Sequence, residues 1–86
     1  MNYMHYEWNN IGPQDVIEIT LDKQANVRLL DDSNYYRYKN GDSYDFRGGT
    51  QVKTPAHLSP PHQGHWHLVV DLKGYVGSVN VGVRLI

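Results

Sequence analysis

Residues 61–86 read PHQGHWHLVVDLKGYVGSVNVGVRLI, and this stretch decides the fold class. Apolar side chains occupy alternate positions along 65–72 and again along 78–86, and the segment 73–77 between them contains two glycines. Alternation with a period of two is typical of half-buried antiparallel strands, because successive side chains leave a pleated backbone on opposite sides. The pattern therefore predicts a hairpin of two strands that forms one side of the hydrophobic core.

The two faces of the first of these strands differ in chemistry. Trp66, Leu68 and Val70 share one face, whereas His65 and His67 lie on the other. Large apolar side chains are usually buried, while histidine is intermediate. We expect the indole and its apolar neighbours to be buried in the core and both imidazoles to be in contact with water.

Shorter alternating segments precede this hairpin. We expect strands at 2–8, 15–21, 25–30, 44–47 and 50–54, and an extended segment at 58–60. The connection 22–24 between the second and third strands is short and polar, which favours their pairing as a hairpin. The pair Gly48-Gly49 is expected to end the fourth strand.

In the segment after the third strand, a helix and a hairpin compete. Its start, Asp-Asp-Ser-Asn at 31–34, offers side chains that cap helix N-termini, which favours a short helical turn. The alternative is a hairpin between 35–39 and 43–47, closed at Asn40-Gly41, because Asn-Gly is common in type I′ turns.

These segments predict an all-β fold: a small antiparallel β-sandwich, or a partly open barrel, of seven to eight short strands, with 1–86 as a single domain. The net charge is −1 and there is no cysteine. Such a charge gives no strong field for nucleic acid or an anionic membrane, and disulfide and thiolate chemistry are excluded. No signal-peptide pattern opens the sequence, and no apolar stretch reaches the roughly 20 residues of a membrane span. We therefore expect a cytoplasmic protein without nucleic-acid or membrane partners.

Several motifs are similar to those of a known family. They are Gln24-Ala25-Asn26-Val27-Arg28-Leu29-Leu30-Asp31, Asn34-Tyr35, Gly48-Gly49, Gly64-His65-Trp66-His67 and Val70-Asp71-Leu72-Lys73-Gly74-Tyr75. In this order they resemble the bacterial domain of unknown function 1883 family over nearly the whole chain. The resemblance implies a small bacterial all-β sandwich, which in the family also occurs joined to a TIR signalling domain. The family has no established activity, so the resemblance implies no catalytic residues.

Three histidines form the first candidate site. His65 and His67 project from the same face of a strand, roughly 6.6–7 Å apart along it, and His62 in the preceding turn could approach them. Three imidazoles that converge, with one position left open, are what a catalytic zinc site requires. Asp71 lies too far along the strand to bind the same ion as His65. The alternative is a row of half-exposed histidines on the polar face of a strand.

An aromatic and basic segment forms the second candidate site. The residues that we expect to contact a ligand or partner are Tyr35, Tyr36, Arg37, Tyr38, Lys39 and Arg47. Interleaved rings and cations bind single-stranded nucleic acid, but the carboxylates of Asp42 and Asp45 oppose the field that such binding requires. Tyrosine-rich surfaces serve protein or small-ligand contacts equally well. The alternative is that Tyr35, Tyr38 and Phe46 fill one end of the sandwich.

The sequence thus favours a non-enzymatic binding or interaction module that uses the segment 35–47. It requires no cofactor, and its partner is an unknown protein or small ligand. The competing class is a zinc-binding protein, hydrolytic or not, that uses His62, His65 and His67. Exposed edge strands could also pair two copies into a weak homodimer, although no motif specifies one.

Overall fold

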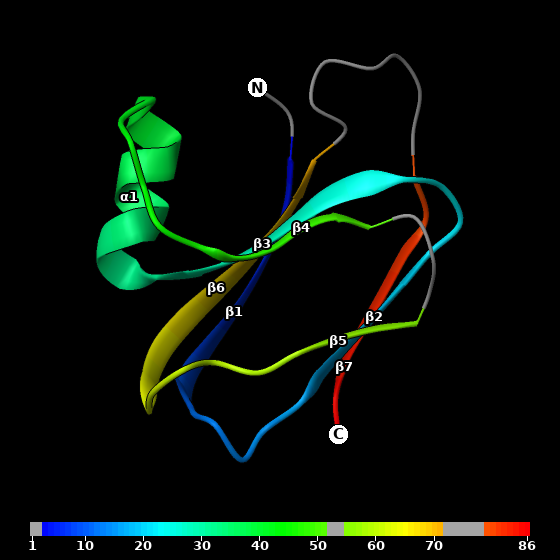
Figure 1. Ribbon diagram of the computed structural model, residues 1–86, viewed down its shortest axis with the longest axis horizontal. Helices are drawn as coiled ribbons and strands as arrows, with labels where there is room; N and C mark the ends of the chain where they lie inside the picture. The colour runs from blue at the N-terminus through cyan, green and yellow to red at the C-terminus, as the bar shows by residue number, and fades with distance from the viewer. Residues whose placement is uncertain (1–2, 52–54, 72–78) are drawn as a thin grey trace.

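The computed structural model describes residues 3–51, 55–71 and 79–86 (Figure 1). Within these residues the chain forms seven strands and one helix. In chain order they are β1 (Tyr3–Ile11), β2 (Ile17–Leu21), β3 (Ala25–Asp31), α1 (Asp32–Asn40), β4 (Arg47–Gln51), β5 (Ala56–Leu58), β6 (Gly64–Asp71) and β7 (Val81–Leu85). No helix among the described residues is long and apolar enough to cross a membrane.

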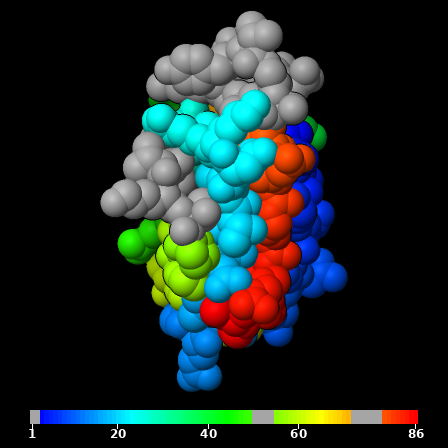
Figure 2. Space-filling model, turned by 90° about the vertical axis from the view of Figure 1, so that its right-hand side faces the viewer, coloured from blue at the N-terminus to red at the C-terminus, as the bar shows by residue number. Residues whose placement is uncertain are grey.

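The strands form two antiparallel sheets. One has four strands in the order β1-β6-β3-β4, and the other has three in the order β5-β2-β7. Figure 2 shows the outer side of the three-stranded sheet, where β5, β2 and β7 lie side by side. The predicted small antiparallel β-sandwich is therefore confirmed, with seven strands and no closed barrel in the described part of the chain.

Apolar side chains from both sheets fill the space between them. The buried members of this core are Ile11, Ile17, Ile19, Ala25, Val27, Leu29, Trp66, Leu68 and Val70. Trp66 is 4% exposed, and its Nε1–H donates to the carbonyl oxygen of His62 at 3.0 Å. The prediction that the indole and its apolar neighbours on β6 face the core is confirmed.

The predicted terminal hairpin is wrong, because β6 and β7 belong to different sheets. β6 lies between β1 and β3, whereas β7 pairs with β2. Every residue from Trp66 to Asp71 is buried, so β6 needs a partner along both edges and cover on both faces. β7 alternates between half-buried and exposed positions, as suits an edge strand. The expected turn 73–77 lies outside the described residues.

The predicted pairing of the second and third strands is also wrong. β2 and β3 lie in different sheets, and residues 22–24 carry the chain from one sheet to the other. Ile17 and Ile19 of β2 and Val27 and Leu29 of β3 all bury their side chains in the core. A hairpin would place both apolar rows on one wall, whereas the crossing places them on opposite walls of the same core.

The segment after β3 forms α1, so the predicted helical turn is confirmed and the hairpin alternative is wrong. Asp31 caps the helix, because its Oδ1 accepts a hydrogen bond at 2.8 Å from the backbone N–H three residues on. Gly41 follows the last turn with a φ of 81°, and the N–H of Asp42 donates to the carbonyl oxygen of Arg37 at 2.9 Å. The Asn-Gly pair thus supplies the left-handed residue of a helix C-cap.

Two predicted short strands, at 44–47 and 50–54, are replaced by the single strand β4, which continues through Gly48 and Gly49. Gly48 has a φ of 117°, and a Cβ there would lie 2.2 Å from the carbonyl oxygen of Val27 on β3. The glycine permits this close approach and does not end the strand. Part of the second predicted strand lies outside the described residues, and the predicted extended segment is β5, which begins two residues earlier.

Candidate functional site

Helix α1 covers the outer face of the four-stranded sheet, on the side away from β2 and β7 (Figure 1). Tyr35 and Tyr38 pack there against Leu30 of β3 and Val69 of β6, in a second and smaller cluster of buried side chains. His67 lies in the same layer and is only 3% exposed. The expectation that both imidazoles of β6 contact water is therefore wrong for His67, because the helix returns over the face that the alternation marks as outer.

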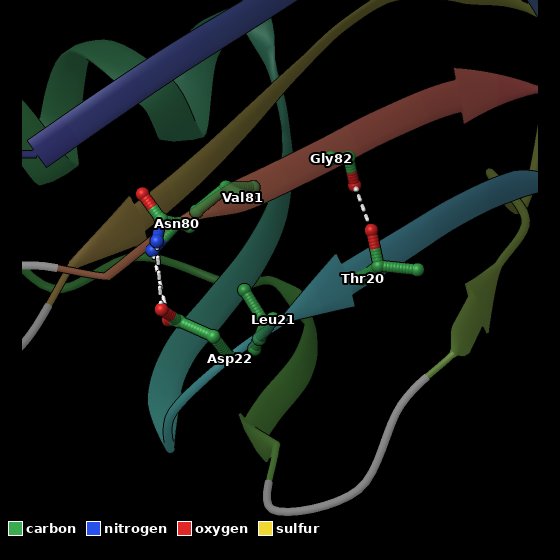
Figure 3. A pocket seen from close by; sticks show the side chains of 6 residues that line it. All are labelled: Thr20, Leu21, Asp22, Asn80, Val81 and Gly82. Carbon is green, nitrogen blue, oxygen red and sulfur yellow. Dashed lines mark hydrogen bonds between the residues drawn. The ribbon is translucent and has the colours of Figure 1, made fainter.

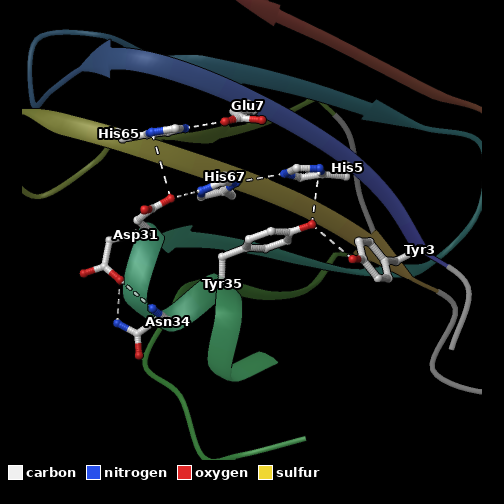
Figure 4. Close-up of polar contacts among 9 residues, drawn as sticks. Tyr3, His5, Glu7, Asp31, Asn34, Tyr35, His65 and His67 are labelled. Atoms are coloured by element: carbon white, nitrogen blue, oxygen red, sulfur yellow. Dashed lines mark hydrogen bonds and ion pairs between the residues drawn. The ribbon is translucent and has the colours of Figure 1, made fainter. Parts of the chain in front are cut away.

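Strand pairing brings polar side chains of β1 and β6 together under the helix. Glu7 of β1 lies directly opposite His67 of β6. Opposite residues of an antiparallel pair share a face, and so do alternate residues along one strand. His5 and Glu7 therefore lie on the same face as His65 and His67, as Figure 4 shows.

Two histidines of β6 pair with carboxylates from two other elements. His65 Nε2 lies 2.5 Å from Glu7 Oε2, and His67 Nε2 lies 2.7 Å from Asp32 Oδ1. His65 Nδ1 also lies 3.9 Å from the same oxygen of Asp32. Asp32 is the first residue of α1, where the helix dipole favours a negative charge. We name His5, Glu7, Asp32, His65 and His67 the His–acid cluster.

His5 and two tyrosines extend the His–acid cluster along β1. His5 Nε2 lies 2.9 Å from His67 Nδ1, and the Tyr35 hydroxyl lies 3.4 Å from His5 Nδ1 and 3.1 Å from the Tyr3 hydroxyl. The Tyr35 ring stacks on both imidazoles, with its centroid 4.4 Å from that of His5 and 4.1 Å from that of His67. A continuous series of hydrogen bonds therefore runs from Asp32 to Tyr3 (Figure 4).

Two members of this series have shifted pKa values, and partial desolvation is the main cause for His5. It lowers the pKa of His5 below its ordinary value, and the neighbouring His67 adds to the effect. His5 is therefore neutral at pH 7, with one ring nitrogen able to accept a hydrogen bond. Burial also raises the pKa of Tyr35, and its hydrogen bond with Tyr3 raises it further, so the hydroxyl keeps its proton.

A separate polar network anchors the other end of the helix. Asp71 is 3% exposed, and its Oδ2 accepts hydrogen bonds from the Tyr38 hydroxyl at 2.7 Å and from Arg28 Nη1 at 2.8 Å. Asn26 Nδ2 donates to Asp71 Oδ1 at 3.2 Å. Burial and the bond to Asp71 raise the pKa of the Tyr38 hydroxyl. This buried carboxylate therefore joins α1 to β3 and β6.

The structure separates His62 from the other two predicted metal ligands. Its ring centroid lies 4.9 Å from that of Trp66, whose side chain leaves the opposite face of β6 from His65 and His67. Two groups of ligand atoms in the described residues lie within 4.8 Å of one another: those of His5, Glu7 and His67, and those of Asp32, His65 and His67. Sequence reasoning thus found two histidines and missed the members that β1 and α1 supply.

The predicted contact residues of the segment 35–47 divide into buried and exposed members. Tyr35 and Tyr38 are 7% and 4% exposed, and they fill the contact between helix and sheet rather than an end of the sandwich. The other four are exposed: Tyr36, Arg37, Lys39 and Arg47. Lys39 Nζ lies 5.5 Å from the ring centroid of Tyr36, within cation–π range. We name these four exposed residues the helix surface.

An open depression lies on the other sheet, between β2 and β7 (Figure 3). Its lining residues are Thr20, Leu21, Asp22, Asn80, Val81 and Gly82. Both carboxylate oxygens of Asp22 accept hydrogen bonds from Asn80, each at 2.8 Å. These six residues include no histidine, and their one carboxylate is already bonded, so the depression offers no acid–base pair.

Comparison with protein families supports the resemblance that the motifs indicate. A family model described as Domain of unknown function (DUF1883) matches residues 1–86. The match therefore includes both sheets, α1 and the whole His–acid cluster. Comparison with curated proteins gives no match, and comparison with solved structures gives none.

Proposed function

The chain belongs to the domain of unknown function 1883 family, and we propose that it is a non-enzymatic binding module that contacts its partner through the helix surface. The observation that supports this most directly is the division among the tyrosines of α1. Tyr35 and Tyr38 are buried, whereas Tyr36 is 53% exposed beside two cations. We further propose that the module works in the bacterial cytoplasm, which the family motifs and the absence of cysteine favour.

Helix α1 presents Tyr36, Arg37 and Lys39 of the helix surface on a rigid support, whereas Arg47 begins β4. Asp31 and Gly41 cap its two ends, and the Tyr38 hydroxyl is bonded to the buried Asp71. A side chain on a fixed support loses less conformational entropy when it binds a partner. Tyr36 in particular offers apolar area and a hydroxyl group with few rotatable bonds.

The chemistry of the helix surface favours a protein partner that carries acidic side chains. Three of its four members are cations, which would complement carboxylates across an interface. The outer side of a helix is convex, whereas small ligands bind mostly in concave pockets. Nucleic acid is a poorer candidate, because Asp42 and Asp45 lie within the segment 35–47 and the net charge is −1.

Two double variants of the full chain test this proposal in a pull-down from a bacterial lysate. Tyr36→Ala with Arg37→Ala removes the centre of the helix surface, and Lys23→Ala with Gln24→Ala changes two exposed residues between β2 and β3. We expect the wild type and the Lys23/Gln24 control to recover the same partner. The helix variant should bind the partner about 30-fold more weakly or worse, because truncation of a central contact residue costs about 2 kcal/mol or more.

Circular dichroism and thermal denaturation of the variants serve as controls for folding. All four positions are exposed, so both double variants should denature at the wild-type temperature within a few degrees. Equal recovery of the partner by the helix variant and the wild type would contradict the proposed surface.

A further inference from the structure

We propose that Asp32, His65 and His67 bind a divalent transition-metal ion such as Zn²⁺ where α1 meets β6. The site lies apart from the helix surface and involves a different ligand, so it does not depend on the proposed partner contact. It takes two of the histidines that the sequence indicates and replaces His62 by a carboxylate of the helix.

The three ligand atoms already surround one point. His67 Nε2 and His65 Nδ1 lie 2.7 Å and 3.9 Å from Asp32 Oδ1, and all three atoms lie within 4.8 Å of one another. Ligand atoms of a tetrahedral zinc ion stand roughly 3.3 Å apart, because each lies about 2.0–2.1 Å from the metal. The observed spacings bracket this value. The side chains of Asp32 and His65 are 56% and 36% exposed, so both have room to rotate toward the ion.

Each of the two histidines has its second ring nitrogen bonded, as metal-binding histidines almost always have. A carboxylate accepts hydrogen bonds, so His65 carries its hydrogen on Nε2 toward Glu7 and keeps the lone pair of Nδ1 for the ion. His67 Nδ1 faces Nε2 of His5 at 2.9 Å, and this ring nitrogen of His5 can accept its hydrogen. When an ion replaces the hydrogen bond between His67 Nε2 and Asp32, this tautomer directs the lone pair of His67 Nε2 at the ion.

The neighbouring group of ligand atoms, from His5, Glu7 and His67, is a weaker candidate. Metal binding there would break two hydrogen bonds, those of His5 with His67 and of His65 with Glu7. Binding at Asp32, His65 and His67 replaces only one hydrogen bond, that of His67 with Asp32. The geometry therefore favours the site that contains Asp32.

Charge and exposure also suit a cation at this site. Asp32 and Glu7 bring two carboxylates close to the ion and compensate its charge. His67 is almost fully buried, whereas Asp32 and His65 border the solvent, so a water molecule can complete the coordination. Imidazole ligands favour first-row transition metals over Mg²⁺ and Ca²⁺. Because Asp32 belongs to α1 and the histidines to β6, a bound ion fastens the helix to the sheet.

The test uses the tag-free chain, purified without a nickel column and stripped with a chelator. It is titrated with Zn²⁺ alone, Co²⁺ alone and Mg²⁺ alone. We expect one equivalent of Zn²⁺ or Co²⁺ to bind, visible absorption bands from bound Co²⁺, and a higher melting temperature with Zn²⁺, because an ion that binds only the folded chain stabilises it. Mg²⁺ should produce none of these effects.

Four variants locate the ion, and none of them changes a side chain of the hydrophobic core. We expect Asp32→Ala and His65→Ala to weaken Zn²⁺ binding by about 100-fold or more, and Glu7→Gln to weaken it by about 10–100-fold because Glu7 only orients His65. His62→Ala is the matched control and should bind Zn²⁺ as the wild type does, within about twofold.

Three results would overturn the proposal. The first is a wild-type chain that binds neither Zn²⁺ nor Co²⁺ at one equivalent. The second is a loss of affinity in His62→Ala as large as that in His65→Ala. The third is a loss of binding in a fifth variant, His5→Phe, with normal binding in His65→Ala, because this pattern places the ion in the neighbouring group.

Discussion

The two faces of β6 are both buried, but different chemistry covers each of them. The inner face contributes Trp66 and aliphatic side chains to a core that apolar packing stabilises. The outer face contributes His67 and Asp71, each 3% exposed, to a layer under α1. Buried polar groups are costly unless they are hydrogen-bonded, so each of them is held by named partners. The inner face therefore supplies bulk stability, and the outer face fixes the helix in one position.

The largest effect is expected from a change on the inner face. Trp66→Ala should lower the free energy of unfolding by about 3–5 kcal/mol, because it removes a large buried ring and leaves a cavity. Urea denaturation followed by circular dichroism measures the loss. A loss below about 1 kcal/mol would show that the space between the sheets is not the main core.

The next effect concerns the buried carboxylate of the outer face. Asp71→Ala should cost about 3 kcal/mol, because the Arg28 guanidinium and the Tyr38 hydroxyl lose an acceptor that they share. Asp42→Ala, at an exposed position just after the helix, is the control and should change the free energy of unfolding by less than about 0.5 kcal/mol. Similar small losses in both variants would mean that polar pairing does not stabilise this layer.

A smaller change isolates one hydrogen bond of the helix. Tyr38→Phe keeps the packed ring and removes the hydroxyl that donates to Asp71, so it should cost about 1.5–2 kcal/mol. Tyr36→Phe removes a hydroxyl from the exposed neighbour and should be nearly neutral. Equal shifts of the urea midpoint in the two variants would show that the hydrogen bond from Tyr38 to Asp71 does not stabilise the fold.

The smallest effect is a dependence of stability on pH that His5 causes. Its pKa is lowered in the folded chain, mainly by burial and then by His67, while Lys39 and His65 act in the same direction and Glu7 opposes them. The unfolded chain therefore binds the proton more readily, so this contribution to stability is complete above pH 6.5 and is lost as the pH falls toward the folded pKa. Urea midpoints measured from pH 7.5 to 5 should fall less in His5→Phe than in the wild type. If the urea midpoint falls with pH equally in both proteins, His5 does not cause the pH dependence.

The sequence predicts the strands and the inner face better than it predicts their pairing. The alternation of Trp66, Leu68 and Val70 is a local signal, and the structure confirms it. The pairing of β6 with β1 and β3 is not local, because both partner strands are distant in the sequence. The alternation within β6 does not indicate which strands lie along its two edges. Short connections suggested hairpins for β2 with β3 and for β6 with β7, but the need for apolar rows on opposite walls of the core outweighed them.

Most of the candidate site could not be predicted for the same reason. His65 and His67 stand two residues apart, and their shared face is visible in the sequence. Asp32 and Glu7 reach them only through the path of α1 and the register of β1. The sequence did contain a signal that α1 packs against the sheet. Its tyrosines at 35 and 38 are three residues apart, which predicts an apolar side of the helix that is buried against another element.

An NMR measurement of contacts between α1 and the outer face of β6 tests most directly whether the helix covers this face. We expect nuclear Overhauser cross-peaks between the ring protons of Tyr35 and those of His67, whose ring centroids lie 4.1 Å apart. Cross-peaks from Trp66 to Leu29 and its neighbours in the core would serve as the internal control. If the core cross-peaks are present and the assigned rings of Tyr35 and His67 show none, the helix does not cover this face and the His–acid cluster does not form.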